Sequence, residues 1–170
     1  MQELLSASDI SLRVSTLGEE IRKRYDGQLL TVIGVLKGSF IFLADLVRAI
    51  DSPSMTIDFL AASSYGNSLS SSGEVRITAD LVKPIEGRHI LLVEDIVDTG
   101  LTIHYLLSVL QARNPSSIAV CALLHKPSRK KVEVPIDYLG FTIEDHFVVG
   151  YGLDFDERYR NLPYIGIYEL

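Results

Sequence analysis

The stretch from Ile90 to Thr102 constrains the fold of this chain more than any other part of the sequence. Four apolar residues lead into the neighbouring carboxylates Glu94 and Asp95, and Asp98 then opens a Thr-Gly-Leu-Thr turn. A short apolar run bounded by turn residues indicates a buried strand of a parallel sheet. Ligands of open α/β sheets bind at the carboxyl ends of the strands, where these acids fall. The stretch therefore predicts an α/β protein with its functional site at that edge.

The turn after this strand suits a phosphate group. Asp98-Thr99-Gly100 leads into a helix predicted at about residues 100–112, so the turn offers backbone N–H groups, hydroxyls and the positive end of a helix dipole. Solvated acids and a helix cap are the simpler alternative, but capping needs no acid pair before the turn. Three carboxylates within five residues repel each other unless a cation or a hydroxyl ligand offsets the repulsion. We therefore expect acids for ribose or a metal ion beside a phosphate-binding turn.

Length, composition and charge narrow the class of protein. The 170 residues, 47% hydrophobic and 22% charged, fit one globular domain spanning residues 1–170. The net charge of −6 argues against a nucleic-acid partner, which a basic surface would favour. Neither a signal peptide nor an 18-residue apolar stretch is present, so we expect no membrane partner. The single Cys121 excludes a disulfide framework and favours the cytoplasm.

Strands and helices are predicted to alternate along the chain. Helical periodicity covers residues 9–26 and 40–50, and Ser39 is a candidate N-cap for the second helix. Besides the strand that begins at Ile90, strands are predicted at 29–35, 55–63, 74–80, 117–124, 136–140, 147–149 and 164–168. A serine-rich loop at 63–73 joins two of these strands into a long hairpin and is expected to be mobile. The pattern predicts an α/β fold, a central parallel sheet flanked by helices, with a small flap.

Further candidate residues follow other strands. Lys37 and Gly38 lie between a predicted strand and helix, where they can meet an anion. Lys126 ends another strand and can donate to a ligand carbonyl, because an ammonium group only donates. Phe147 and Asp154 place an aromatic ring and an acid in the last third of the chain. Lys37 and Lys126 have a simpler interpretation as exposed lysines, and Phe147 has one as a core residue.

The segment Ile90–Thr102 resembles the signature by which type I phosphoribosyltransferases bind 5-phosphoribosyl-1-pyrophosphate (PRPP). Other segments resemble the 6-oxopurine branch of that family, and closest is the group of compact bacterial hypoxanthine-guanine enzymes. Val35–Ser39 is similar to its pyrophosphate-binding loop, and Ser64-Tyr65-Gly66 with the serines that follow is similar to its flexible catalytic loop. Leu124–Arg129 and Phe147–Pro163 are similar to its purine-binding flap. The resemblance spans nearly the whole chain in the family's order.

The resemblance implies a role for each matched residue. The implied PRPP- and phosphate-binding residues are Lys37, Gly38, Ser64, Tyr65, Glu94, Asp95, Ile96, Val97, Asp98, Thr99, Gly100, Leu101, Thr102 and Arg160. The implied purine-binding residues are Lys126, which would donate to the 6-oxygen, Phe147, which would stack on the ring, the Val148 backbone, and Asp154. The implied Mg²⁺ ligands are Glu94, Asp95 and Asp154, and Asp98 would be the catalytic base at purine N7. A cis peptide bond is also implied just before Lys37.

The resemblance further implies purine salvage by a cytoplasmic homodimer or homotetramer. The reaction would transfer the 5-phosphoribosyl group of PRPP to N9 of hypoxanthine or guanine, giving IMP or GMP and pyrophosphate. The sequence departs from the family pattern at His125, where an acid is more common, and at the variable position His146. The alternative is a PRPP- or nucleotide-sensing regulator on the same scaffold. Such a regulator would need a basic face and a nucleic-acid module, for which a net charge of −6 and 170 residues leave little room.

Overall fold

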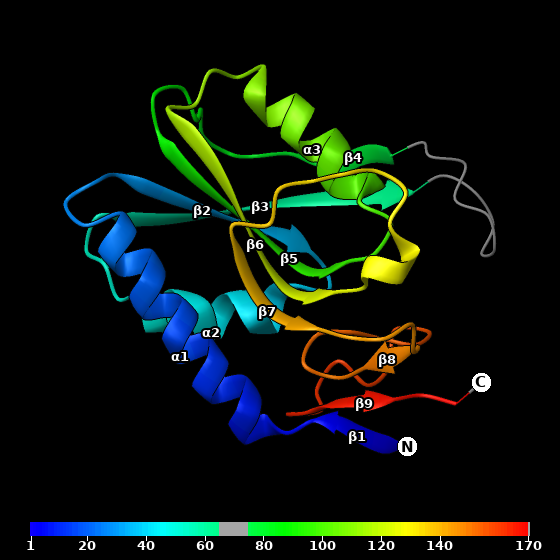
Figure 1. The fold of residues 1–170 in the computed structure, drawn as a ribbon. Helices are drawn as coiled ribbons and strands as arrows, with labels where there is room; N and C mark the ends of the chain where they lie inside the picture. Colours follow the sequence, from blue (N-terminus) through cyan, green and yellow to red (C-terminus); the bar gives the residue numbers. More distant parts are fainter. Residues whose placement is uncertain (65–74, 170) are drawn as a thin grey trace.

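The computed structural model describes residues 1–64 and 75–169, and this part of the chain forms a six-stranded sheet covered by helices on both faces (Figure 1). The strand order is β4-β3-β2-β5-β6-β7. The strands are β2 (Leu30–Leu36), β3 (Met55–Ser64), β4 (Val75–Ala79), β5 (His89–Val97), β6 (Ser117–His125) and β7 (Tyr138–Thr142). Neighbouring strands are parallel except for the antiparallel pair β3–β4. The predicted parallel sheet and its hairpin are therefore confirmed, with β7 two residues later than expected.

Helices α1 (Ala7–Arg24) and α2 (Phe40–Ile50) cover one face of the sheet, and α3 (Leu101–Gln111) covers the other (Figure 1). The first two helices pack closely at Gly18, where an added Cβ atom would lie only 2.5 Å from the Cβ of Ala49. Ser39 is the N-cap residue of α2, as predicted, but its side chain makes no capping hydrogen bond. Its hydroxyl is buried and donates to the Val35 carbonyl at 2.7 Å, which ties the start of α2 to the end of β2.

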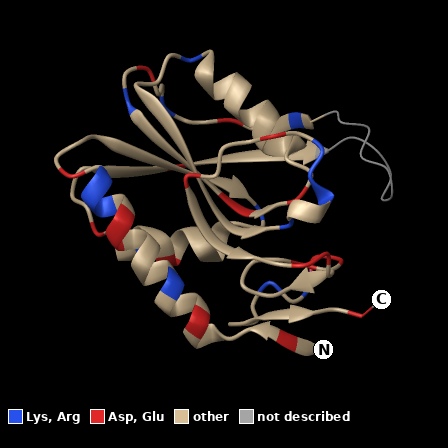
Figure 2. Cartoon of the chain, in the orientation of Figure 1, with Lys and Arg blue, Asp and Glu red and all other residues tan. Residues whose placement is uncertain are grey.

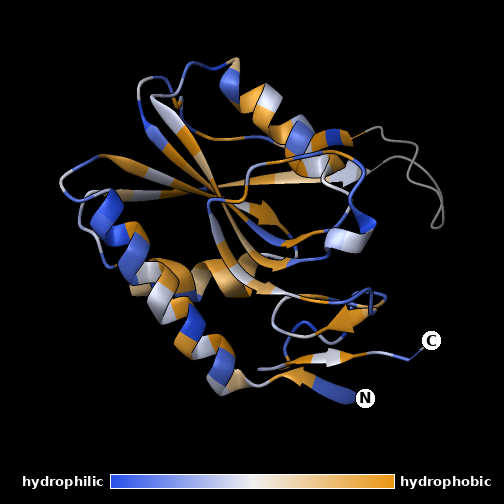
Figure 3. Cartoon of the chain, in the orientation of Figure 1, coloured by the Kyte–Doolittle hydropathy of each residue, from blue (hydrophilic) through white to orange (hydrophobic). Residues whose placement is uncertain are grey.

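Side chains that alternate along the strands fill two hydrophobic clusters, one on each face of the sheet. On β5, Leu91 and Val93 join the cluster under α1 and α2, whereas Ile90 and Leu92 join the cluster under α3. The hydropathy colours of Figure 3 follow this arrangement, with the apolar strands enclosed between amphipathic helices. None of the helices in the described ranges combines the length and the apolar character that a membrane span requires.

A smaller antiparallel sheet forms the predicted flap. Its strands, in order, are β1 (Gln2–Leu5), β9 (Ile165–Ile167) and β8 (Val148–Val149), so the two ends of the chain lie side by side (Figure 1). The sequence did not predict β1, a short strand whose pairing partner is more than 150 residues away. Val148 and Ile165 belong to the same cluster as α1 and α2, so the flap packs on the main core.

Candidate active site

The acid pair of β5 lies at the carboxyl edge of the sheet, as predicted. Glu94 is buried, and its Oε1 accepts a hydrogen bond from the backbone N–H of Asp95 at 3.2 Å, so the two side chains approach each other although both residues belong to the strand. Burial raises the pKa of Glu94 well above its usual value, and the adjacent Asp95 carboxylate raises it further. Burial also raises the pKa of Asp95. A bound cation would relieve this unfavourable accumulation of negative charge.

This donor set fits Mg²⁺ that is completed by substrate. Within residues 1–64 and 75–169, no three His, Cys, Asp or Glu side chains gather as a metal cage. Mg²⁺ is usually held by one or two carboxylates together with water and substrate phosphates. Glu94 and Asp95 supply such a pair. Asp154 lies in the flap, where its Oδ1 is 3.1 Å from Arg160 Nη2 and its Oδ2 accepts from the Glu157 N–H at 2.9 Å.

The loop between β2 and α2 fits closely between the acid pair and the flap. The peptide bond between Leu36 and Lys37 is cis, as the family resemblance implies. A Cβ atom at Gly38 would lie 1.6 Å from Oδ2 of Asp95. On the other side, a Cβ atom at Gly152 would lie 2.2 Å from the Gly38 carbonyl oxygen, and Gly152 has a φ of +101°. Both positions therefore need glycine, and three distant segments meet at this loop.

Two predicted phosphate-binding cations, Lys37 in this loop and Arg160 in the flap, share Glu157 as a partner. Lys37 Nζ lies 2.9 Å from Oε2 of Glu157. Arg160 donates from Nη1 to the Gly152 carbonyl at 2.8 Å, and its Nη2 lies 3.3 Å from Oε1 of Glu157. The Arg160 side chain is only 17% exposed, so its position is well defined by these contacts. No sequence pattern selects Glu157, because this residue lies in a mixed-charge run that is typical of a solvated turn.

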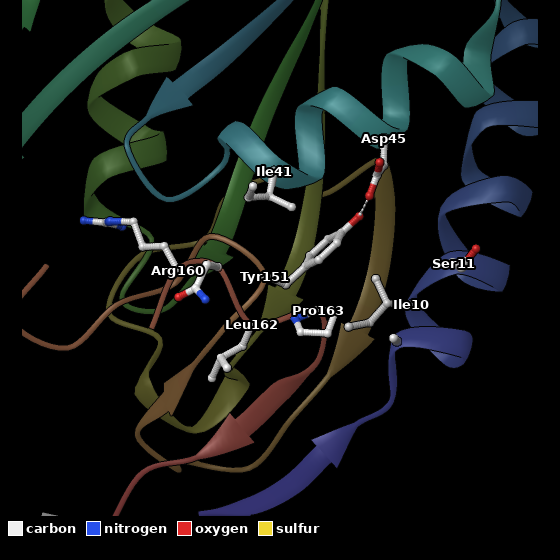
Figure 4. Close-up of a pocket in the computed structure, with 10 residues that line it drawn as sticks. Ile10, Ser11, Ile41, Asp45, Tyr151, Arg160, Leu162 and Pro163 are labelled. Atoms are coloured by element: carbon white, nitrogen blue, oxygen red, sulfur yellow. Dashed lines mark hydrogen bonds between the residues drawn. The ribbon is translucent and has the colours of Figure 1, made fainter. Parts of the chain in front are cut away.

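A pocket of about 360 Å³ lies between α1, α2 and the flap (Figure 4). Inside it, the Tyr151 hydroxyl donates to the Asp45 carboxylate on α2, and burial raises the pKa of Tyr151. Arg160 borders the pocket, but its guanidinium extends away from Tyr151 (Figure 4). The pocket therefore separates part of the flap from α1 and α2. Across it, the Tyr151–Asp45 hydrogen bond anchors the flap to α2.

The turn after β5 leads directly into the N-terminus of α3, where backbone N–H groups can meet an anion. Gly100 has a φ of +85° and begins α3 without a side-chain cap of its own, while the Leu101 N–H donates to Thr99 Oγ1 at 3.3 Å, a long contact that a bound anion could replace. The Thr99 carbonyl accepts from the N–H groups of Lys131 and Val132 at 2.9 and 3.2 Å, which holds the turn in place. Val97 is buried, and its carbonyl accepts from the Lys126 N–H at 3.0 Å. The turn and the end of β6 are therefore connected.

Asp98 and Lys126 are joined by two charged residues that the sequence did not single out. Arg129 Nε lies 2.8 Å from Asp98 Oδ1, although that buried oxygen has no partner with hydrogen-bond geometry in the described part of the chain. Asp145 lies 3.6 Å from Arg129 and 3.7 Å from Lys126, which is almost fully buried. Figure 2 shows basic and acidic segments on this side of the sheet, at the 3₁₀ helix Pro127–Arg129 and in the flap. The basic run after Lys126, which the sequence suggested is solvated, is in part a component of the site.

Phe147 presents an aromatic ring beside this cluster. Its side chain is 42% exposed, and its ring packs edge-on against Phe155 and Tyr168 at centroid distances of 5.7 and 6.3 Å. The Tyr168 N–H donates to the Phe147 carbonyl at 2.8 Å. Val148 is buried in β8, and Asp145, two residues before Phe147, contacts Lys126. The exposed ring and the Lys126 ammonium therefore belong to the same part of the site.

Some predicted residues take no part in these contacts or cannot be placed. Ile96 is partly buried against one hydrophobic cluster and Val97 is buried in the other, so only their backbones can serve a ligand. His146 lies 3.4 Å from Glu144, and His125 contributes its carbonyl to the Ile143 N–H at 3.0 Å. The predicted Tyr65 and loop 65–73, together with the side chain of Ser64, lie outside the described residues.

Residues 1–156 match the sequence model of the phosphoribosyl transferase domain. The chain belongs to the phosphoribosyltransferase family. The hypoxanthine phosphoribosyltransferase of Haemophilus influenzae is 48% identical over 166 residues, which cover 96% of this chain and 92% of the relative. The hypoxanthine-guanine phosphoribosyltransferase of Bacillus subtilis is 49% identical over 164 residues, which cover 96% of this chain and 91% of the relative. The family resemblance inferred from Ile90–Thr102 is therefore confirmed.

Solved structures agree with this membership. The crystal structure of a Staphylococcus aureus hypoxanthine phosphoribosyltransferase has a TM-score of 0.95 and 43% identity, with 99% of this chain and 91% of that chain covered. A Bacillus anthracis hypoxanthine-guanine phosphoribosyltransferase has a TM-score of 0.94 and 43% identity, with 99% of both chains covered. The architecture is thus the type I phosphoribosyltransferase fold, including the flap.

Proposed function

We propose that this protein is a purine-salvage enzyme that transfers the 5-phosphoribosyl group of PRPP to N9 of hypoxanthine or guanine. The products are IMP or GMP and pyrophosphate. The observation that carries the proposal is the contact of Asp95 with the β2–α2 loop, where Gly38 leaves no room for a Cβ atom. This contact joins acids that suit ribose to a loop that suits pyrophosphate. The proposal is also supported by relatives of 48–49% identity that are named for hypoxanthine or hypoxanthine-guanine transfer.

PRPP binding is assigned to three neighbouring groups of residues. The turn Asp98–Thr102 would hold the 5′-phosphate through the N–H groups at the start of α3 and through its hydroxyls. Glu94 and Asp95 would bind the ribose hydroxyls, directly or through Mg²⁺. Lys37, the Gly38 backbone and Arg160 would contact the pyrophosphate. Ser64 and Tyr65 are assigned to the covering loop by family resemblance alone.

Purine binding is assigned to the cluster around Lys126. Lys126 would donate to the 6-oxygen, Phe147 would stack on the ring, and the backbone of Val148 would read the ring edge. Adenine presents an amino group at the same position, which cannot accept a hydrogen bond from the nearly buried Lys126 ammonium group, so adenine is expected to be rejected. Asp154, in the flap, is assigned to the purine side and as an additional ligand for a metal ion.

The chemical step exchanges one bond to C1 of the ribose for another. The bond from C1 to the pyrophosphate oxygen breaks, pyrophosphate leaves with the bonding electrons, and purine N9 forms the new bond from the opposite face. The proton that the purine must lose is assigned to Asp98, whose buried Oδ1 accepts no hydrogen bond from the described residues. Lys37 and Arg160 would stabilise the charge that develops on the leaving pyrophosphate. Mg²⁺, when bound, supplies further charge neutralisation as a Lewis acid.

Nucleotide formation tests the proposal directly. The protein is mixed with Mg²⁺ and PRPP, and hypoxanthine, guanine, xanthine or adenine is added separately. We expect IMP from hypoxanthine and GMP from guanine, a loss of turnover when Mg²⁺ is chelated, and no AMP. Turnover of adenine but not of hypoxanthine would refute the role of Lys126. The absence of turnover with every base would refute the function itself. The relatives reported above are named as enzymes, and nothing in them supports a regulator.

The proposal includes the cellular setting and assembly of the protein. We propose a single domain over residues 1–170, because residues of the flap and of α1 share one hydrophobic cluster. A cytoplasmic location is consistent with a free, buried Cys121. A homodimer or homotetramer is consistent with the exposed apolar side chains of Phe40, Ile57 and Phe59. One cooperative unfolding transition and a mass measured by light scattering test the domain and the assembly.

A further inference from the structure

The Glu157 carboxylate forms ion pairs with both of the cations that are assigned to pyrophosphate. Its Oε2 lies 2.9 Å from Lys37 Nζ, and its Oε1 lies 3.3 Å from Arg160 Nη2. Lys37 belongs to the loop after β2 and Arg160 belongs to the flap, 120 or more residues later in the chain. The carboxylate therefore spans the two walls between which a pyrophosphate group would bind.

The local backbone positions this carboxylate. The Glu157 N–H donates to Asp154 Oδ2 at 2.9 Å, and reciprocal hydrogen bonds of 3.2 and 3.0 Å between Phe155 and Arg158 close the turn around it. Glu157 has a φ of +62° at the tip of this turn. Its side chain is nevertheless 64% exposed, so it can leave the cations and enter water without moving the backbone. The contact is thus formed by a fixed backbone and a movable carboxylate.

We propose that Glu157 is an internal competitor of pyrophosphate, and that it sets the affinity of the enzyme for the pyrophosphate groups of PRPP and of the product. This inference rests on the proposed function, because that function assigns pyrophosphate to Lys37 and Arg160. Pyrophosphate carries several negative charges and displaces the single carboxylate. The displaced carboxylate then repels the bound anion over a short distance, which further lowers affinity. An enzyme that binds a highly charged leaving group between two cations gains from such a competitor because product release is faster.

The test compares Glu157→Gln with a matched control in the same turn. Asp156→Asn removes the same charge from the neighbouring residue, which also has a positive φ, but Asp156 contacts Arg158 at 3.5 Å rather than Lys37 or Arg160. Titration calorimetry with inorganic pyrophosphate and Mg²⁺, and the KM for PRPP, are measured for both variants. Because exposed ion pairs are weak, we expect Glu157→Gln to lower the pyrophosphate Kd and the PRPP KM by about three- to tenfold. The control should change each value by less than about twofold.

Two further measurements identify the cause. In a Lys37→Met background, Glu157→Gln should give a smaller gain in affinity than in the native chain, because one of the contested cations is gone. Glu157→Asn, which also tolerates a positive φ, should repeat the tighter binding if Glu157→Gln is poorly folded. An unchanged or weaker pyrophosphate affinity in both Glu157 variants, in a protein that still forms nucleotide, would overturn the inference and leave the function intact. Failure of the native protein to form nucleotide would overturn the function and this inference with it.

Discussion

Gly38→Ala tests the contact on which the proposed function depends. The added Cβ atom would lie 1.6 Å from Oδ2 of Asp95, far inside any permitted separation. The loop also packs closely against the flap on its other side. A Cβ atom on Gly152 would lie only 2.2 Å from the Gly38 carbonyl oxygen. Either the Asp95 carboxylate or the loop that carries Lys37 must therefore move. Both movements separate the acid that suits ribose from the loop that suits pyrophosphate.

The expected losses differ for stability and for catalysis. Forcing an extra methyl group into a packed site typically costs about 1–3 kcal/mol, which corresponds to a fall in Tm of roughly 2–12 °C for a domain of this size. Displacement of site groups by about 1 Å can cost roughly a hundredfold in rate. We therefore expect kcat/KM for PRPP to fall by about ten- to a hundredfold.

Gly27→Ala is the matched control. Gly27 has a φ of +69° and no atom within 4 Å of an added Cβ, so its substitution strains the backbone without touching the site. That strain costs about 1–2 kcal/mol, close to the cost expected at Gly38. Steady-state kinetics with varied PRPP and thermal unfolding are measured for both variants. If Gly38→Ala and Gly27→Ala lose equal stability and both keep the native KM and kcat, the Asp95–Gly38 contact does not serve PRPP, and the reasoning is refuted.

Three further substitutions address other parts of the molecule. Asp98→Asn should lower kcat by about 10²–10⁴-fold while the Kd for PRPP stays nearly native, and equal losses in both would contradict its role as base. Lys126→Met should reduce the preference for hypoxanthine over adenine by about tenfold or more in competitive assays, and unchanged selectivity would contradict its role at the 6-oxygen. Hydrogen bonds from Arg113 lower the pKa of Asp80 in the folded protein. The pair therefore stabilises the fold at pH values above the pKa of Asp80 in the unfolded chain. This stabilisation is lost as the pH falls through the lower pKa of the folded state. Because Asp80 is half exposed, Asp80→Asn should cost at most about 1 kcal/mol at neutral pH, and a Tm difference that persists in strong acid would show that another interaction is involved.

The half of the candidate site that we assign to PRPP was predictable because its residues are local in sequence. The strand, the acid pair and the phosphate-binding turn are consecutive between Ile90 and Thr102, and one parallel strand followed by one helix places them all at the same edge. Hydrophobic periodicity also predicted α2 within the observed bounds. The strand β1 was not predicted, because it forms only by pairing with β9 at the far end of the chain. Ser39 was correctly predicted as the N-cap position, but its hydroxyl donates to the preceding strand and does not cap the helix.

The residues that the sequence missed share a physical character. Arg129, Asp145 and Glu157 lie in charged runs that are typical of solvated surface, and each acquires a partner only when distant segments fold together. Glu157, for example, meets Lys37 across 120 positions. A motif can identify groups that contact a substrate, because the substrate requires them at fixed spacing. It cannot identify the countercharges that those groups pair with before substrate arrives. Substrate class is therefore readable from the sequence, whereas the countercharges that we propose to set affinity are found only in the folded structure.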